Sequence, residues 1–189
     1  MKSRTSTALP ENHELLSHEL TTAGLPSNAN ENATKLNISV EHAQTRNWLW
    51  LACAVSVHNY FSPDSPVTQC QVASQITGQS CCSSPMPDAC NVERDPSAAL
   101  RALNNLNRVC SARDFNFSDV QNEILAGRPL ILSVSSPGVE SGRVIVLFGI
   151  DDASNVYVMD PQTGTARANF MDIANFYCEL SGEVSFTQR

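Results

Sequence analysis

Hydrophobic positions follow a helical period in the first half of the chain and strand-like stretches in the second half. An apolar run over residues 47–61 predicts a long helix, which two prolines, Pro63 and Pro66, prevent from continuing. Three further helices are predicted at residues 67–77, 96–106 and 117–126.

Residues that typically begin or end helices set these bounds. Gly78 and Gly127 stand where the second and fourth helices should stop, and Pro96 suits the first turn of the third. Ser118 is the expected N-cap of the fourth helix. Residues 79–95, rich in Ser, Pro and Cys, predict a loop.

Short apolar stretches bounded by turn residues follow the helices. They predict strands at residues 130–135, 143–151, 155–160, 166–169 and 183–187, with one helix at 171–178 before the last strand. Helices first and an antiparallel sheet afterwards is the order of an α+β fold, in which an N-terminal helical half packs on a C-terminal sheet.

The N-terminal segment has a different composition from the rest. Residues 1–38 are rich in Ser, Thr, Asn, Glu and Pro, and only residues 14–20 form a short amphipathic pattern, so we assign the folded domain to residues 39–189. The segment is interpreted as a disordered tail, a docking peptide or an export address. No apolar region follows Met1, which predicts a cytoplasmic protein or one exported without a classical signal peptide.

The most specific motif is the run Gln-Thr-Arg-Asn-Trp-Leu-Trp-Leu-Ala-Cys-Ala at residues 44–54. It resembles the Asn-Trp-Cys-Trp-Ala-Ala segment that opens the central helix of bacterial papain-like cysteine peptidases, such as those of plant-pathogen effectors. In that family a glutamine five residues before the cysteine helps to stabilise the oxyanion, and Gln44 matches it. Leu49 stands at the position of the nucleophilic cysteine, and a leucine side chain has no lone pair with which to form a covalent intermediate.

The resemblance continues through the predicted strands and covers about residues 40–165. The family has a Gly-Arg-Pro-hydrophobic strand and then a histidine after glycine. This chain has Gly-Arg-Pro at 127–129, with Gly142 followed by Arg143 at the histidine position. A guanidinium stays protonated and cannot act as a general base. Asp160, before Pro161, matches the residue that orients the histidine. The resemblance thus implies a papain-like fold with remnant active-site positions Gln44, Leu49, Arg143 and Asp160 and no catalytic residue.

Each of these residues also has a simpler structural interpretation. Trp48 and Trp50 are expected to pack in the core, although with Gly142 they are candidates for lining the former cleft. Asp160 is equally suited to capping a turn, and Gln44 to bonding neighbouring backbone in a loop. Arg143 either pairs with Asp160 or faces solvent.

The seven cysteines have two interpretations, as disulfides or as buried thiols: Cys53, Cys70, Cys81, Cys82 and Cys90 lie in the helical half, and Cys110 and Cys178 lie apart. Adjacent Cys81 and Cys82 lack the paired spacing of a zinc site, so no metal is expected. The resemblance favours disulfides that join the 79–95 loop to the two preceding helices. Cys53 lies one helical turn beyond Leu49 and should be too deep, and too far from a histidine, to replace the nucleophile.

Composition limits the classes of partner. With 42% hydrophobic residues the chain can bury a core, and no apolar run approaches the roughly 20 residues that cross a bilayer. The net charge is −7, which disfavours nucleic acid as a partner. This average does not describe a local basic patch such as Arg101, Arg108 and Arg113 could form. We expect no cofactor and no membrane association, and the pattern indicates no oligomeric state.

Two classes of function follow. The favoured one is a pseudoenzyme that binds a peptide or protein partner without hydrolysis, as an adaptor, a regulator or a non-hydrolytic effector. The alternative is an enzyme of different chemistry that reuses the cleft with groups such as Asp160, Gln44, Glu140 and Ser136 or Ser141. An open groove at Trp48, Leu49 and Arg143 would favour binding there, whereas a filled one would direct the partner elsewhere.

Overall fold

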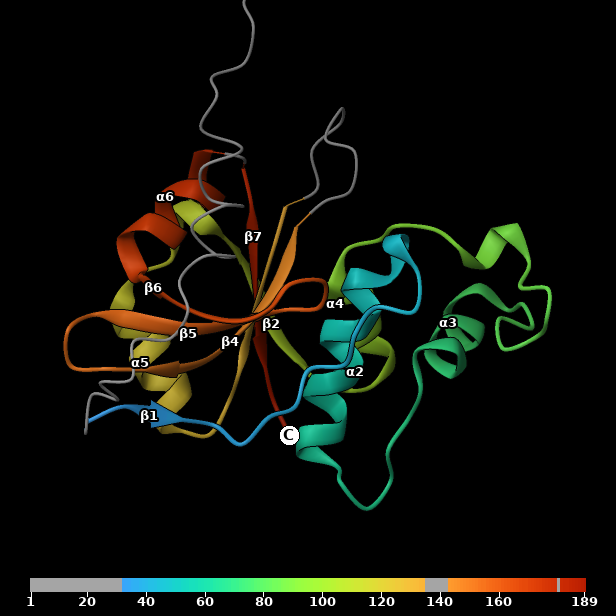
Figure 1. The fold of residues 1–189 in the computed structure, drawn as a ribbon, viewed down its shortest axis with the longest axis horizontal. Coiled ribbons are helices and arrows are strands. Elements are labelled where there is room, and N and C mark those ends of the chain that lie inside the picture. The colour runs from blue at the N-terminus through green and yellow to red at the C-terminus, as the bar shows by residue number, and fades with distance from the viewer. Residues whose placement is uncertain (1–31, 135–142, 180) are drawn as a thin grey trace, which may run out of the picture.

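One antiparallel sheet runs through the centre of the molecule, with helices packed on both of its faces (Figure 1). The computed structural model describes residues 32–134, 143–179 and 181–189. The strand order is β2-β7-β3-β4-β5-β6, and β1 pairs with the end of β4. The strands are β1 (Thr34–Lys35), β2 (Leu106–Ser111), β3 (Leu130–Ser133), β4 (Val144–Ile150), β5 (Asn155–Asp160), β6 (Gly164–Asn169) and β7 (Glu183–Thr187).

Five α-helices and three short 3₁₀ turns are described within these ranges. The α-helices are α2 (Leu49–Phe61), α3 (Gln69–Thr77), α4 (Pro96–Ala102), α5 (Phe117–Leu125) and α6 (Phe170–Glu179). The 3₁₀ turns are η1 (Arg46–Trp48), η2 (Asp88–Cys90) and η3 (Ala112–Asp114). In Figure 1, α2, α3 and α4 lie on one side of the sheet and α5 and α6 on the other. This arrangement confirms the predicted α+β class.

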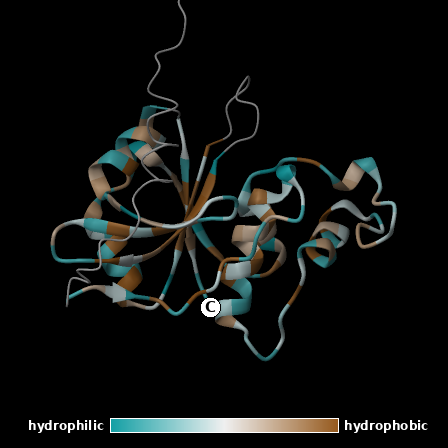
Figure 2. Ribbon diagram, viewed as in Figure 1, coloured by the Kyte–Doolittle hydropathy of each residue, from teal (hydrophilic) through white to brown (hydrophobic). Residues whose placement is uncertain are grey.

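Alternation along β4 divides the core into two layers. Val144, Val146 and Phe148 pack toward α2, while Ile145 and Leu147 pack toward α5 and α6. Because helices cover both faces of the sheet at β4, every one of its residues is buried. Figure 2 shows the hydrophobic colouring concentrated in these central strands.

The helices have the end signals that their sequences predict, with one exception. Gly78 adopts the left-handed conformation that ends α3, and Gly127 has a positive φ after α5. Asn116 caps α5 in place of Ser118, because its side chain accepts from the Asp119 N–H while Asp119 bonds back to the Asn116 N–H. This reciprocal capping box satisfies two N–H groups at the start of the helix, which begins at Phe117 as predicted.

Two strands were not predicted. The third predicted helix stops at Ala102, and Asn104, which has a positive φ, turns the chain into β2. β2 is an edge strand with a mixed burial pattern, so its sequence lacks clear alternation. β1 falls inside the predicted tail. There Leu36 N–H bonds the Phe148 carbonyl and Ile38 is buried, so the packed chain includes residues before 39.

No helix in the described ranges is long and apolar enough to cross a membrane.

Candidate functional site

The helix that bears the resemblance begins at Leu49. Residues 46–48 form the 3₁₀ turn η1, and Leu49 is the first residue of α2. Its side chain is 6% exposed and belongs to the core layer on the α2 face of the sheet. The position that the resemblance assigns to the nucleophile is therefore at a helix N-terminus and is filled by packed hydrocarbon.

The two tryptophans lie on either side of Leu49 in the chain, and both are buried in the core. Trp48 and Trp50 are each 1% exposed. The indole N–H of Trp48 donates to the Cys90 carbonyl at 2.7 Å, and that of Trp50 donates to the Val92 carbonyl at 3.1 Å. Both rings are thus hydrogen-bonded to the backbone of the 79–95 loop. A role in lining a cleft stays a prediction for them, and Gly142 lies outside the described residues.

Gln44 is exposed, and its backbone is fixed by a hydrogen bond. Its N–H donates to the side-chain oxygen of Gln69 at 3.1 Å, and the Gln69 amide donates to the Glu41 carboxylate and to the His42 carbonyl. Gln69 is 1% exposed, so a buried amide fixes the segment that leads into the central helix. Sequence reasoning assigned no role to Gln69, because its burial and its partners at residues 41–44 cannot be read from the local sequence.

Arg143 and Asp160 lie at one end of the sheet, at the start of β4 and the end of β5. Val146 pairs with Met159, which places Arg143 and Asp160 on neighbouring parts of the chain at the same end of the sheet. The Asp160 carboxylate accepts from the N–H groups of Gln162 at 2.7 Å and Thr163 at 3.2 Å. It caps the turn after β5, as its simpler interpretation predicts, and direct pairing with Arg143 stays a prediction.

Tyr177 of α6 joins this end of the sheet and was missed by sequence reasoning. Its side chain is buried, and burial raises its pKa far above the ordinary value. The negative charge of Asp160 raises this pKa further, and the positive charge of Arg143 opposes that effect. Tyr177 is thus a buried phenol whose pKa responds to the charges of Asp160 and Arg143, and no motif in the resemblance marks it.

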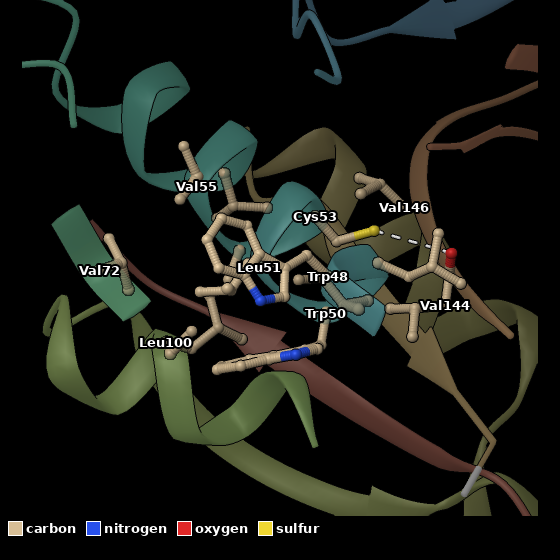
Figure 3. Close-up of a cluster of buried hydrophobic side chains, with 14 of the residues drawn as sticks. Trp48, Trp50, Leu51, Cys53, Val55, Val72, Leu100, Val144 and Val146 are labelled. Atoms are coloured by element: carbon tan, nitrogen blue, oxygen red, sulfur yellow. Dashed lines mark hydrogen bonds between the residues drawn. The ribbon is translucent and has the colours of Figure 1, made fainter. Parts of the chain in front are cut away.

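Cys53 is the thiol nearest in sequence to the nucleophile position, and it is fully buried. Its Sγ donates to the Val144 carbonyl at 3.7 Å, as Figure 3 shows. Burial raises the pKa of this thiol well above its ordinary value, and the charge of Asp160 raises it further. A catalytic thiol needs a lowered pKa and a base, whereas Cys53 faces a carbonyl that cannot take up a proton.

The described histidines are engaged elsewhere. His42 is exposed and its Nδ1 contacts the Pro161 carbonyl at 3.1 Å. His58 Nδ1 contacts the side-chain oxygen of Asn105 at 2.7 Å. His58 is five residues beyond Cys53 on α2, which places it about 140° around the helix from the thiol.

Four cysteines form two disulfides. Cys70 of α3 is bonded to Cys82, and Cys81 is bonded to Cys90. The 79–95 loop is therefore joined to α3 as expected, but it is not joined to α2, because Cys53 is a buried free thiol. Within the described ranges no group of three or more His, Cys, Asp or Glu residues could hold a metal ion.

Comparison with known proteins identifies the class. The family model of the papain-like cysteine protease AvrRpt2 matches residues 30–180. The chain therefore belongs to this family, and the resemblance to effector cysteine peptidases is confirmed.

Similarity to individual proteins is weaker. Among solved structures, the chain is similar to the Pseudomonas avirulence protein AvrPphB with 12% sequence identity and a TM-score of 0.38, over 80% of this chain and 96% of that one. No curated protein matches the chain.

Proposed function

We propose that this chain is a non-hydrolytic member of the papain-like cysteine protease family, which binds a peptide or protein partner in or near the former active-site cleft. The observation that carries the proposal is the leucine at the first position of α2, where the family resemblance requires a thiol. Leu49 removes the nucleophile, and Arg143 at the histidine position removes the base.

The remaining thiol on α2 does not compensate for this loss. Cys53 is 0% exposed, so a substrate carbonyl cannot reach its sulfur without displacement of the core around it. Its raised pKa keeps it protonated at neutral pH, and its hydrogen-bond partner is a backbone carbonyl. These properties support a structural thiol and oppose a relocated nucleophile.

Partner contact is proposed at the exposed rim that precedes the helix. Leu49, Trp48 and Trp50 are buried, whereas Gln44 and Arg46 are exposed in the segment that leads to them. Gln69 holds this segment through the backbone of Gln44 and His42, so the backbone that carries these exposed side chains has a defined position. A preformed rim of this kind reduces the entropy lost on binding.

The experiment is a selection of binders from a displayed random peptide library on the full-length protein. Selected peptides should bind more weakly to Gln44→Ala and Arg46→Ala than to the wild type, and they should be recovered intact by mass spectrometry. Arg113→Ala is the matched control, since Arg113 is also an exposed arginine but lies in η3. Binding that is equally strong for all variants would refute the rim as the contact, and cleaved peptides would refute the non-hydrolytic function.

A further inference from the structure

The buried residues of the 79–95 loop are Cys81 and Cys90, which form a disulfide with each other. Most described residues of the loop are exposed, whereas Cys81 is 3% and Cys90 is 1% exposed and both belong to the core layer with α2. Figure 1 shows that α3 and this loop extend away from the sheet, on the side of α2 and α4. The loop therefore cannot rely on sheet packing to keep its shape.

The same loop is fastened to the start of α2 by three consecutive carbonyls. Asn47 Nδ2 donates to the Asn91 carbonyl at 3.0 Å, between the bonds of Trp48 to Cys90 and Trp50 to Val92. Cys90 is thus both a member of a disulfide and the hydrogen-bond acceptor of a buried indole. Cys90 therefore connects the Cys81–Cys90 disulfide to the helix end that carries Leu49.

The two disulfides differ in access to solvent. Cys82 is exposed and Cys70 is half-buried, so a thiolate can reach the Cys70–Cys82 bond. Cys81 and Cys90 are shielded, and the loop must loosen before their bond can be attacked. Thiol–disulfide exchange requires direct approach of the attacking sulfur, so the exposed bond should react first.

We propose that these disulfides form a redox-sensitive latch that holds the 79–95 loop against the N-terminal end of α2. A small dithiol reduces the Cys70–Cys82 bond and then the Cys81–Cys90 bond. In each step one S–S bond breaks, the two cysteines gain two electrons and two protons, and the dithiol is oxidised to its disulfide. The freed loop withdraws its carbonyls from Trp48 and Trp50 and exposes this end of α2. The latch is independent of whether the site binds or cleaves a partner.

The chain provides its own reporters, because Trp48 and Trp50 are its two tryptophans. The experiment titrates the full-length oxidised protein with dithiothreitol and follows tryptophan emission. In parallel, alkylation of the free thiols and peptide mass mapping identify which cysteines have been reduced. Far-UV circular dichroism monitors the sheet.

The latch predicts two stages. Cys70 and Cys82 become alkylated first with little change in emission, and alkylation of Cys81 and Cys90 then coincides with a shift of emission to longer wavelength. The sheet signal is retained, and reoxidation restores the original emission. Cys81→Ala/Cys90→Ala should show the shifted emission without reductant, whereas Cys110→Ala/Cys178→Ala, which removes free thiols, should titrate like the wild type.

Three results would overturn the proposal. Unchanged emission in the fully reduced protein would show that the loop does not depend on the disulfides. Reduction of Cys81–Cys90 before Cys70–Cys82 would contradict the order set by exposure. Loss of the sheet signal together with the emission change would show global unfolding instead of a local release.

Discussion

The two faces of the central sheet are stabilised in different ways. On the α5 and α6 face, aromatic side chains pack against the strands, with Phe115 in edge contact with both Phe170 and Phe186. On the opposite face, the outer part of the helical layer depends on two disulfides and on hydrogen bonds from buried indoles.

The two faces should therefore differ in whether their stability depends on redox conditions. Packing on the sheet depends on apolar area and is indifferent to redox conditions. The proposed latch predicts that a thiol reagent removes the Cys70–Cys82 and Cys81–Cys90 cross-links while the sheet stays intact. The helix α2 lies at the boundary, since Leu49 and Cys53 pack in the core layer on the sheet while Trp48 and Trp50 donate hydrogen bonds to the loop.

The largest effect is expected from a truncation in the sheet. Leu147 of β4 is fully buried, so Leu147→Ala should lower the free energy of unfolding by about 3 kcal/mol, in the range of 2–5 kcal/mol for buried leucines. Urea denaturation followed by circular dichroism measures the loss, with and without dithiothreitol. The comparison predicts the same loss in both conditions, and a marked dependence on the reductant would contradict it.

A buried ion pair also lies on the sheet side of this comparison. The Asp151 side chain is inaccessible to solvent and accepts from Arg167, from the backbone of Ala153 and Asn155 and from the Asn155 amide. Asp151→Ala should lower the free energy of unfolding by on the order of 3 kcal/mol, because it leaves these donors without their acceptor. Asp64→Ala, at an exposed aspartate after α2, is the matched control and should cost much less.

The same carboxylate makes stability depend on pH. Burial alone would raise the pKa of Asp151, but the hydrogen bonds from Arg167, Asn155 and Ala153 outweigh it and hold this pKa below its ordinary value. A lowered folded-state pKa gives stability that is present above the unfolded value of about 3.9 and is lost as the pH falls through the folded value. Urea midpoints between pH 7 and pH 3 should therefore fall less steeply for Asp151→Ala than for the wild type, and parallel curves would refute this assignment.

In the 79–95 loop, unlike at Leu147, the effect of a substitution should depend on redox conditions. Cys81→Ala/Cys90→Ala should lower the free energy of unfolding of the oxidised protein by about 2.5 kcal/mol, because the unfolded chain is no longer restricted by a cross-linked loop of this length. In dithiothreitol the wild type has lost the same cross-link, so the difference should nearly vanish. Urea denaturation in both conditions measures this, and a difference that persists in reductant would mean that the side chains stabilise the loop by packing alone.

The smallest effects come from a pair of matched helix caps. Thr68 caps α3 on the loop side and Asn116 caps α5 on the sheet side, each in a capping box. Replacement of either by alanine should cost about 1 kcal/mol in the oxidised protein. In reductant the Thr68→Ala effect should shrink, because α3 loses its bond to Cys82, while the Asn116→Ala effect should persist. Ser118→Ala should be near neutral, and a cost equal to that of Asn116→Ala would contradict the observed cap.

Much of the fold follows from local pattern. The strands β5 and β7 have the bounds that alternation and turn residues predict, and Gly78 ends α3 as expected. The edge strand β2 was missed because its residues are all half-buried or exposed, so its sequence shows no hydrophobic alternation. β1 was missed because two exposed residues give no pattern at all.

The site was predictable only where residue identity decides the chemistry. Leu49, Arg143 and Asp160 are notable in the sequence because the family requires other chemistry at the first two of these positions. Tyr177 and Gln69 were not predicted, since their roles arise from burial beside residues far away in the chain. Which cysteine pairs with which is likewise a property of distance, and the spacing of Cys70, Cys81, Cys82 and Cys90 left several pairings open.

The central claim is that this member of a protease family does not cleave peptides. The most direct measurement incubates the full-length wild type with a diverse mixture of peptides and identifies products by mass spectrometry, with Cys53→Ala measured in parallel. The account predicts no products above the background of buffer alone for either protein. Cleavage by the wild type that is abolished in Cys53→Ala would contradict it, because the buried thiol would then be the nucleophile.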